Sequence, residues 1–502
     1  MLEAHLVVHP AFTVAPVPPR LFGSFVEHMG RCVYTGIYEP THRSATADGF
    51  RQDVLDLVHE LCVTTVRYPG GNFVSGYRWE DGVGPREARP RRLELAWHTT
   101  ETNEFGLNEF IRWARQAKVE PMLAVNLGTR GIQEAIDLLE YTNHPAGTTL
   151  SDLRVTHGAT ASHDVRMWCL GNEMDGPWQI GHKTAREYGR LAAETAKAMH
   201  RIDPSLELVV CGSSNARMPT FGSWEDEVLD LTWDDVDWLS LHSYYEPLNG
   251  DDASFLASGV GMDRCIDAVV ATVDAVAARR QSAKKIKLSF DEWNVWYEAR
   301  FDQSFGDAGW DPAAPLIEDE YTTMDAVAFG GLVLSLLRHC DRVQAASLAQ
   351  LVNVIGPIRT QPGGPAWRQT IFFPFAQAAA RAQGVVLRGA LTAPTYETQQ
   401  WGAAPVCDAV VTTDPERGVT VLFAINRSLD EPVTLNTDLT GFPPQTIAES
   451  WVLTSADPSS ANTADAPDRV RPVPLEKAEV RDRQLHVELP PLSWTMTVLQ
   501  AA

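Results

Sequence analysis

The 502-residue chain contains no long hydrophobic run, because no apolar stretch approaches the ~20 residues that a membrane-spanning helix needs. At its start, no basic segment leads into an apolar run of the kind that a secretory signal peptide carries. We therefore expect neither a membrane anchor nor export. The sequence predicts a cytoplasmic protein that has no membrane partner.

Cysteine is sparse. The seven cysteines form an odd number, lie far apart and include no Cys-x-x-Cys pair. We expect reduced and mostly buried thiols in place of a disulfide framework or a zinc site, and we interpret Cys169 as a core residue. A convincing Gly-x-Gly-x-x-Gly or P-loop motif is also missing, which argues against a dinucleotide- or nucleotide-binding fold.

Positive charge is in the minority. The chain has 42 lysines and arginines against 65 aspartates and glutamates, a net charge of −23, and its basic residues do not cluster. Nucleic acids and anionic membrane surfaces are therefore not expected as partners. The acidic balance is compatible with a neutral ligand such as a sugar.

What the sequence does contain, over its first ~380 residues, is a repeated unit of a short apolar run, a loop and an amphipathic helix. The eight apolar runs, rich in β-branched residues, occupy residues 21–29, 63–70, 121–128, 165–173, 206–214, 237–245, 286–294 and 343–352. Helical patterns occupy residues 53–61, 107–117, 132–141, 184–202, 224–231, 262–280 and 321–340. Eight such units predict an α/β fold, a (β/α)8 TIM barrel with strands buried on both faces. A doubly wound sheet is the alternative, but it normally has fewer strands and a glycine-rich phosphate loop.

Beyond about residue 383, apolar and polar residues alternate between turns rich in Gly, Pro and Asp. This pattern predicts a C-terminal antiparallel β-sandwich with strands at residues 385–391, 406–412, 419–426, 433–435, 446–453 and 484–489. Residues 455–474 predict a long surface loop, and residues 5–14 predict a strand that joins the sandwich. The expected domains are an N-terminal strand segment at residues 1–17, a catalytic barrel at residues 18–380 and the sandwich at residues 381–502.

Polar side chains gather where the apolar runs end, and a barrel of this kind has its active site at that end. They are carboxylates, amides and aromatics with almost no lysine, and include Glu27, Arg67, Asn72, Asn126, Asn172, Glu173, His242, Tyr244, Glu292 and Gln350. Carboxylates and amides bind hydroxyl groups, and aromatic faces contact the C–H surface of a sugar ring. The set therefore predicts a site for a neutral polyhydroxylated ligand.

Two glutamates dominate this set. Glu173 ends the fourth run in WCLGNE and Glu292 ends the seventh in LSFDEWN, so they face each other across the barrel mouth. Retaining glycoside hydrolysis needs two carboxyls ~5–5.5 Å apart. Asn172 is suited to hold a sugar 2-hydroxyl, whereas Arg67 and Tyr244 are suited to keep a nucleophile ionised. We therefore predict that Glu173 is the general acid/base and Glu292 the nucleophile.

Some neighbouring residues have alternative interpretations. Glu27 either lines the sugar site beside Asn72 or is a buried structural carboxylate paired with Arg67. We interpret His242 as a supporting residue that forms hydrogen bonds without reacting itself. Asp291 is expected to point away from the catalytic face, because side chains alternate along a strand.

Tryptophans follow several strand ends and belong either to the core or to the walls of the sugar site; they are Trp79, Trp97, Trp178 and Trp296. We predict that Trp97 and Trp296 bind substrate. His28, His98 and Asp175 do not make a convincing ligand set, so no metal site is predicted.

Long stretches around these residues resemble glycoside hydrolase family 51, the α-L-arabinofuranosidases. They extend from about residue 20 to residue 360 and read GSFVEHMGRCVYTGIYEP, VRYPGGNFVSGYRWEDGVGP, RPRRLELAWHTTETNEFGLNEF, WCLGNEMDGPWQIGHKTAREYGRLAAETAK, SLHSYYE, LSFDEWNVWY and LAQLVNVIGPI. The C-terminal sandwich resembles the family's accessory domain only in its general pattern of alternating apolar and polar residues.

The resemblance implies an acid/base at Glu173 in the GNE motif and a nucleophile at Glu292 in the DEWN motif. It also implies residues that hold the furanose hydroxyls or the nucleophile, namely Glu27, Asn72, Asn172, Tyr244 and Gln350. It implies no metal or organic cofactor, and a homo-hexamer. Thr35 and Glu298 depart from the family pattern; both are expected at the rim, where they would affect the leaving group and leave the chemistry unchanged.

The expected function is that of a retaining, exo-acting α-L-arabinofuranosidase that acts on oligosaccharides from arabinan or arabinoxylan. The resemblance, more than the chemistry of the residues, narrows the sugar to arabinofuranose. An endoglucanase or β-xylosidase built on the same frame is the first alternative. An inactive sugar-binding barrel is the second, and the presence of both glutamates argues against it.

Overall fold

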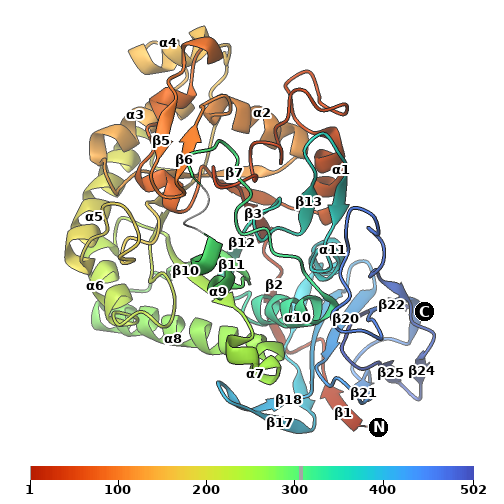
Figure 1. Cartoon of the computed structure of the whole chain (residues 1–502). Helices are drawn as coiled ribbons and strands as arrows, with labels where there is room; N and C mark the ends of the chain where they lie inside the picture. Colours follow the sequence, from red (N-terminus) through yellow and green to blue (C-terminus); the bar gives the residue numbers. More distant parts are fainter. Residues whose placement is uncertain (1, 305–308) are drawn as a thin grey trace.

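The computed structural model describes residues 2–304 and 309–502. In these ranges, eight parallel strands form a closed barrel in which each strand pairs with the next along the chain and the last pairs with the first. They are β3 (Arg20–Phe25), β4 (Thr65–Tyr68), β7 (Glu120–Val125), β8 (Met167–Leu170), β9 (Glu207–Val210), β10 (Trp238–Tyr245), β11 (Lys287–Val295) and β12 (Val343–Leu348). The predicted (β/α)8 barrel is confirmed, and Figure 1 shows it as the larger body of the molecule.

Helices surround the barrel (Figure 1), and every helical pattern found in the sequence forms one. These helices are α1 (Gln52–Leu61), α2 (Leu107–Ala117), α3 (Ile132–Asn143), α5 (Ala185–Ile202), α6 (Ser223–Thr232), α8 (Ser258–Arg279) and α10 (Thr323–Arg338). Thr184 caps α5, since its side chain accepts a hydrogen bond from the backbone N–H of Glu187. The helix ends before the Asp203-Pro204 pair that predicted its end.

Four further helices were not predicted: α4 (Thr149–Thr156), α7 (Asp252–Leu256), α9 (Glu298–Ser304) and α11 (Phe372–Arg381). Helix α11 follows the eighth strand and contacts α1 and α10, so it completes the ring of barrel helices. Its first turn contains Pro374, which fits there because the N–H groups of a first turn have no partner within the helix.

The C-terminal part of the chain forms two facing sheets. One contains β2 (Thr13–Pro16), β15 (Val385–Leu387), β19 (Cys407–Asp414), β20 (Val419–Asn426), β26 (Ser493–Ala501), β22 (Gln445–Leu453) and β23 (Val473–Pro474). The other contains β16 (Ala390–Thr392), β1 (Leu2–Val7), β21 (Val433–Asp438), β25 (Gln484–Leu489) and β24 (Ala478–Arg481). Leu435 and Val487 of the second sheet share a buried core with Leu422 and Leu499 of the first, as in a sandwich.

Two details of the sandwich differ from prediction. Strand β1 pairs in parallel with β21, so the sheet is not antiparallel throughout. Residues 455–474 are not simply a surface loop, because Asn462 and Val470 are buried and the backbone N–H of Thr323 donates to the carbonyl of Ser460. This segment covers the start of α10, where the carbonyls of Pro458 and Ser460 accept from N–H groups that have no partner within the helix.

Helix α10 joins the two parts of the molecule. It packs on β11 of the barrel and on β19, β20 and β26 of the sandwich. A Cβ atom on Gly330 would lie 2.6 Å from the ring of Trp494, so only glycine permits this close approach. On the same helix, the guanidinium of Arg338 binds Asp263 of α8 and Asp408 of the sandwich. Apolar contact and partly buried ion pairs together fix the sandwich to the barrel.

The remaining elements are short. They are the two-stranded sheets β5 (Arg92–Glu94) with β6 (Thr99–Glu101), β13 (Ile358–Thr360) with β14 (Ala366–Arg368), and β17 (Thr395–Thr398) with β18 (Gly402–Pro405), and the 3-10 helices η1 (Asn72–Ser75), η2 (Trp79–Gly82), η3 (Arg86–Ala88) and η4 (Leu248–Gly250). Among the described residues, no helix has the length and apolar character needed to cross a membrane. Six of the seven cysteines are buried, and Cys169 packs inside the barrel as predicted.

Candidate active site

Glu173 is placed by a tight turn after β8. Gly171 has a φ of +93° and Glu173 itself has a φ of +43°, so the backbone reverses as soon as the strand ends. Glycine tolerates such a conformation without cost, whereas a residue with a side chain is strained by it. The turn directs Asn172 and Glu173 into the barrel mouth, where only 9% of Glu173 is exposed.

Glu292 lies in β11 beside a local break in strand pairing. The register of β11 against β12 shifts between Phe290 and Trp293. Such a shift interrupts the strict alternation of side chains. Asp291 consequently faces Arg67, with Oδ2 3.8 Å from Nε, and is buried. Our prediction that Asp291 points away from the catalytic face is therefore wrong.

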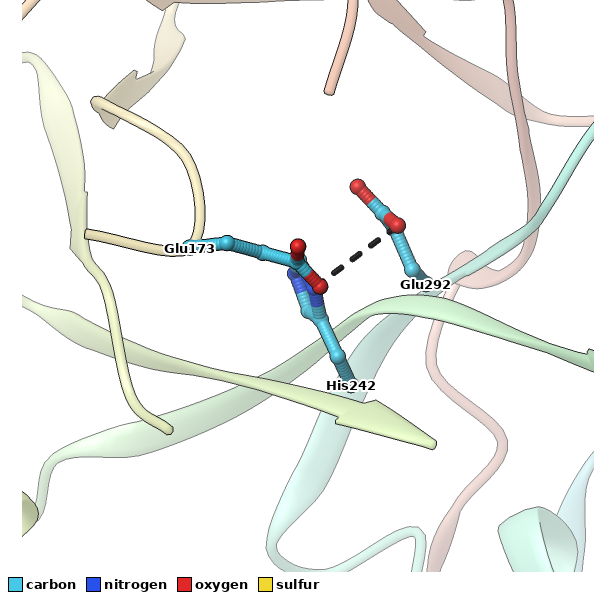
Figure 2. A group of neighbouring side chains, drawn as sticks. All are labelled: Glu173, His242 and Glu292. Carbon is cyan, nitrogen blue, oxygen red and sulfur yellow. Dashed lines mark hydrogen bonds and ion pairs between the residues drawn. The ribbon is translucent and has the colours of Figure 1, made fainter. Parts of the chain in front are cut away.

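The two glutamates face each other. One carboxylate oxygen of each and Nδ1 of His242 all lie within 4.8 Å of one another. His242 Nδ1 is 3.0 Å from Glu173 Oε1 and 3.7 Å from Glu292 Oε2, so the imidazole bridges the pair (Figure 2). The separation is near the ~5–5.5 Å of retaining glycosidases and well below the ~6.5–9.5 Å of inverting ones.

The hydrogen bonds of the two carboxylates differ. Glu292 accepts from the Arg67 guanidinium at 2.8 Å through Oε1 and from the Tyr244 hydroxyl at 2.7 Å through Oε2. Arg67 also donates to Asn172 Oδ1 at 2.6 Å. Glu173 has no arginine partner among the residues that the structure describes and instead accepts from the indole N–H of Trp178 at 2.7 Å. The Arg67 guanidinium and the Tyr244 hydroxyl therefore hold Glu292 and not Glu173, while His242 contacts both.

These environments move the two pKa values in opposite directions. Burial raises the pKa of Glu173 above its ordinary value, and the nearby Glu292 charge adds to the rise, although His242 and Trp178 oppose it. Burial also disfavours the charged form of Glu292, but His242, Arg67 and the Tyr244 hydroxyl outweigh it and hold its pKa below the ordinary value. A proton on Glu173 beside an ionised Glu292 is the state that an acid and a nucleophile require.

His242 titrates with the pair. Its burial disfavours the imidazolium form, but the charges of Glu292 and Glu173 outweigh that effect and raise the pKa of His242. The residue is buried and does not line the cavity. The supporting role of His242 remains a prediction.

Glu27 occupies the other side of the site. Its Oε1 accepts from the backbone N–H of Phe73 at 2.9 Å and from the indole N–H of Trp97 at 3.0 Å, and its Oε2 accepts from the Gln350 amide at 3.1 Å. Burial, reinforced by the Glu292 charge, raises the pKa of Glu27 to about 8. No ion pair between Glu27 and an arginine occurs in the described ranges, so the alternative of a structural pair is not supported.

These groups border a cavity of about 440 Å³, within the range of small-molecule sites. The predicted residues that line it are Glu27, Asn72, Trp97, Glu173, Tyr244, Glu292, Trp296 and Gln350. The other three predicted residues do not line it: Arg67 binds Glu292, His242 binds Glu173, and Asn172 accepts a hydrogen bond from Arg67.

Sequence reasoning missed part of this lining. Ile180, Asn215 and Arg217 border the cavity from loops that follow strands, and Phe301 borders it from α9. Asn215 is an amide directly after the fifth apolar run, so it carried the same signal as the other strand-end residues, whereas the other three lie further along the chain from the end of a run. Trp178 was predicted only as core or wall, whereas it also donates to Glu173.

Glu173, His242 and Glu292 also form the single cluster of acidic and imidazole groups, among the described residues, that is compact enough for a metal ion. Both oxygens of Glu292 are already bound, one by the Arg67 guanidinium and one by the Tyr244 hydroxyl. A guanidinium at this distance repels a cation. The donor set therefore suits proton transfer better than metal binding, and the absence of a metal remains a prediction.

The other residues weighed as metal ligands lie apart. His28 Nδ1 is 2.9 Å from the carboxylate of Glu101. Asp175 accepts from the backbone N–H of Ser214 at 3.1 Å. Neither forms a cluster with His98 in the described part of the chain. The hydrogen bonds of His28 and Asp175 stabilise loops around the site.

Known protein families match the chain over most of its length. A sequence model described as "Alpha-L-arabinofuranosidase 1 domain" matches residues 57–255. A second, described as "Alpha-L-arabinofuranosidase C-terminal domain", matches residues 291–493 and so spans the last barrel strands and most of the sandwich.

Individual relatives are similar from end to end. An "Intracellular exo-alpha-(1->5)-L-arabinofuranosidase" from Streptomyces lividans is 57% identical over 98% of this chain and 75% of its own length. An "Exo-alpha-(1->6)-L-arabinofuranosidase" from Bifidobacterium longum is 52% identical over 98% of this chain and 96% of its own length. The solved structure of AbfB, a family 51 α-L-arabinofuranosidase from Bifidobacterium longum, superposes with a TM-score of 0.95 and 48% identity over the whole of both chains. This chain belongs to the α-L-arabinofuranosidases of glycoside hydrolase family 51.

Proposed function

We propose that the chain is a retaining, exo-acting α-L-arabinofuranosidase that removes terminal non-reducing arabinofuranosyl groups from arabinan- and arabinoxylan-derived oligosaccharides. The observation that carries this proposal is the pair Glu173 and Glu292, close enough for double displacement and with pKa values moved apart. Family membership supports arabinofuranose as the sugar. An endoglucanase, a β-xylosidase and an inactive barrel receive no comparable support.

In the first step, the Glu292 carboxylate attacks the anomeric carbon while Glu173 gives its proton to the glycosidic oxygen. The bond between these two substrate atoms breaks, the leaving sugar departs with the proton, and an arabinosyl ester remains on Glu292. In the second step, ionised Glu173 takes a proton from water, whose oxygen attacks the anomeric carbon and releases Glu292. Two inversions leave the anomeric configuration unchanged.

Asn172 is oriented to serve the sugar 2-hydroxyl. A guanidinium only donates hydrogen bonds, so the amide oxygen of Asn172 must face Arg67. Its Nδ2 is then directed elsewhere, and it is buried without a partner in the described ranges. The carbonyl Oε1 of Gln350 is likewise buried and unpaired there. Such groups gain a partner when sugar hydroxyls arrive, which favours binding.

The natural substrate, location and assembly belong to the same proposal. The names of the relatives above print (1→5) in one case and (1→6) in the other, at similar identity, so either linkage is a candidate. We propose an intracellular enzyme that acts on short imported oligosaccharides, as the name of the Streptomyces relative suggests. We also propose a homo-hexamer, to be tested by light scattering of the purified chain.

Activity on a panel of substrates tests the reaction class. The panel contains aryl α-L-arabinofuranoside, aryl β-D-xyloside, aryl β-D-glucoside and cellulose. We expect turnover on the first and little on the others. Proton NMR during the first minutes should show a retained anomer; an inverted first product would refute double displacement.

Two variants separate the roles of the glutamates. Glu292→Ala should abolish turnover of the aryl arabinofuranoside, and azide should restore a product of inverted configuration because it attacks in place of the missing carboxylate. Glu173→Ala should lose most activity on natural oligosaccharides yet still form the ester readily from substrates with good leaving groups. Full activity of Glu173→Ala on natural substrates would exclude it as the acid.

A further inference from the structure

The leaving group has a predictable side of the cavity if the proposed function holds. Glu173 gives its proton to the glycosidic oxygen, so the departing sugar lies beside Glu173. This glutamate follows β8, and the next barrel strand is β9. The hydroxyl and backbone N–H of Ser214, after β9, both donate to Asp175, after β8, so the two loops are tied together. Residues after β9 therefore border the leaving sugar.

Arg217 is the charged residue of this loop that lines the cavity. Its Nη2 donates to Glu298 Oε2 at 3.1 Å, and Glu298, the first residue of α9, also lines the cavity. The side chains are 62% and 44% exposed, so the pair lies at the cavity mouth. The pair also lies near Glu246, which follows β10. Burial raises the pKa of Glu246, the charge of Glu298 adds to the rise, and the charge of Arg217 opposes it.

The chemistry of this pair suits a sugar. A guanidinium has five N–H donors and no acceptor. In the described ranges, Glu298 is the single carboxylate within ion-pair distance of Arg217, so most of its donors remain available for hydroxyl oxygens. The backbone N–H of Arg217 donates to the Asn215 side chain at 2.9 Å, which fixes the loop. Exposed Leu95 and Trp178 at the same cavity offer apolar contact for the C–H surface of a ring.

An exposed ion pair of this kind contributes little to stability. Its effect on the geometry is larger, since Glu298 restricts a long side chain that would otherwise move freely in water. We propose that Arg217, held at the cavity mouth by Glu298, binds hydroxyl groups of the leaving sugar and thereby favours saccharide over simple aryl leaving groups.

The test compares two substrates of the intact enzyme. The measured quantity is the ratio of kcat/KM for an α-(1→5)-linked arabino-oligosaccharide to kcat/KM for an aryl α-L-arabinofuranoside. Arg217→Ala should lower this ratio about tenfold, the loss expected for one hydrogen bond from a charged donor. Glu298→Ala should lower it about threefold, because the guanidinium remains but is less restricted. The double variant should be no worse than Arg217→Ala, as coupled residues behave.

A matched control is Arg279→Ala. Arg279 forms an exposed pair with Asp226 at 2.9 Å between α8 and α6, away from the cavity, and its loss should leave the ratio unchanged. Thermal unfolding confirms that each variant is folded. An unchanged ratio in Arg217→Ala, or additive losses in the double variant, would overturn the inference. A wild-type enzyme inactive on the aryl arabinofuranoside would instead refute the proposed function itself.

Discussion

Removing one hydroxyl group from Tyr244 tests how the nucleophile is kept ionised. In Tyr244→Phe, Glu292 loses a buried donor that lies 2.7 Å from its Oε2. A hydrogen bond to a charged group contributes ~1.5–3 kcal/mol. We use the lower end, about 1.5 kcal/mol, because Arg67 and His242 still favour the carboxylate.

The direction of the expected shift in the pH profile follows from the role of the Glu292 carboxylate. The Tyr244 hydroxyl lowers the pKa of Glu292, so its removal raises that pKa. In the proposed mechanism Glu292 attacks as the carboxylate, so kcat/KM falls as the pH drops through its pKa, and the acid limb of the profile moves to higher pH. Since ~1.4 kcal/mol corresponds to a factor of ten, kcat/KM on the acid limb should fall about tenfold below wild type.

The assay is the pH dependence of kcat/KM on an aryl α-L-arabinofuranoside, which reports ionisation of the free enzyme. The matched control is Tyr245→Phe, which removes the same group from the next residue of β10. No hydrogen bond joins Tyr245 to either catalytic glutamate in the described part of the chain. An acid limb that stays in place in Tyr244→Phe, or that moves equally in Tyr245→Phe, would refute the reasoning.

Three other changes follow from the same contacts. His242→Gln removes a positive charge that lowers the pKa of both Glu173 and Glu292. Both limbs of the pH profile of kcat/KM should therefore move to higher pH. A shift of one limb alone would contradict the position of His242 between the two carboxyls. Trp178→Phe removes a donor that lowers the pKa of Glu173, so the basic limb should move to higher pH while the acid limb stays. Gly330→Val places a side chain against Trp494 and should lower the free energy of unfolding by ~1–3 kcal/mol, seen as a lower Tm with the pH profile unchanged.

Periodicity predicted the barrel well because its signals are local. Buried parallel strands are continuous apolar runs, and helices such as α2 and α5 show a clear 3.6-residue period with capping residues at their ends. The eighth helix, α11, was missed although its apolar residues follow the helical period, because it is short and contains a proline, which argues against a helix interior. The parallel pairing of β1 was missed because its direction depends on a distant partner strand. Leu2 of β1 pairs with Val433 of β21, more than 400 residues further along the chain.

The candidate site was predicted because strand ends meet at one place in a barrel, whatever lies between them in sequence. The orientation of Asp291 was not predicted correctly. A shift in strand register depends on the neighbouring strand, so the residues of β11 alone do not indicate it. The same limit applies to the pair of Arg217 and Glu298, which joins loops 81 residues apart. Contacts between loops depend on backbone paths that sequence patterns do not specify.

The different roles of two identical side chains depend on the position of one arginine. Arg67 donates to Glu292 and to Asn172, the residue before Glu173, but not to Glu173 itself. Its charge therefore stabilises the ionised form of Glu292, while burial and the charge of Glu292 favour the protonated form of Glu173. His242 contacts both carboxyls and lowers the pKa of each, whereas Arg67 and Tyr244 bind Glu292 alone. If a strand-end arginine bound Glu173 in place of Glu292, we would expect the two roles to be reversed. The sequences around the two glutamates would be unchanged. The residues of the GNE and DEWN motifs therefore predict a catalytic pair, but their chemistry alone does not assign the role of each glutamate.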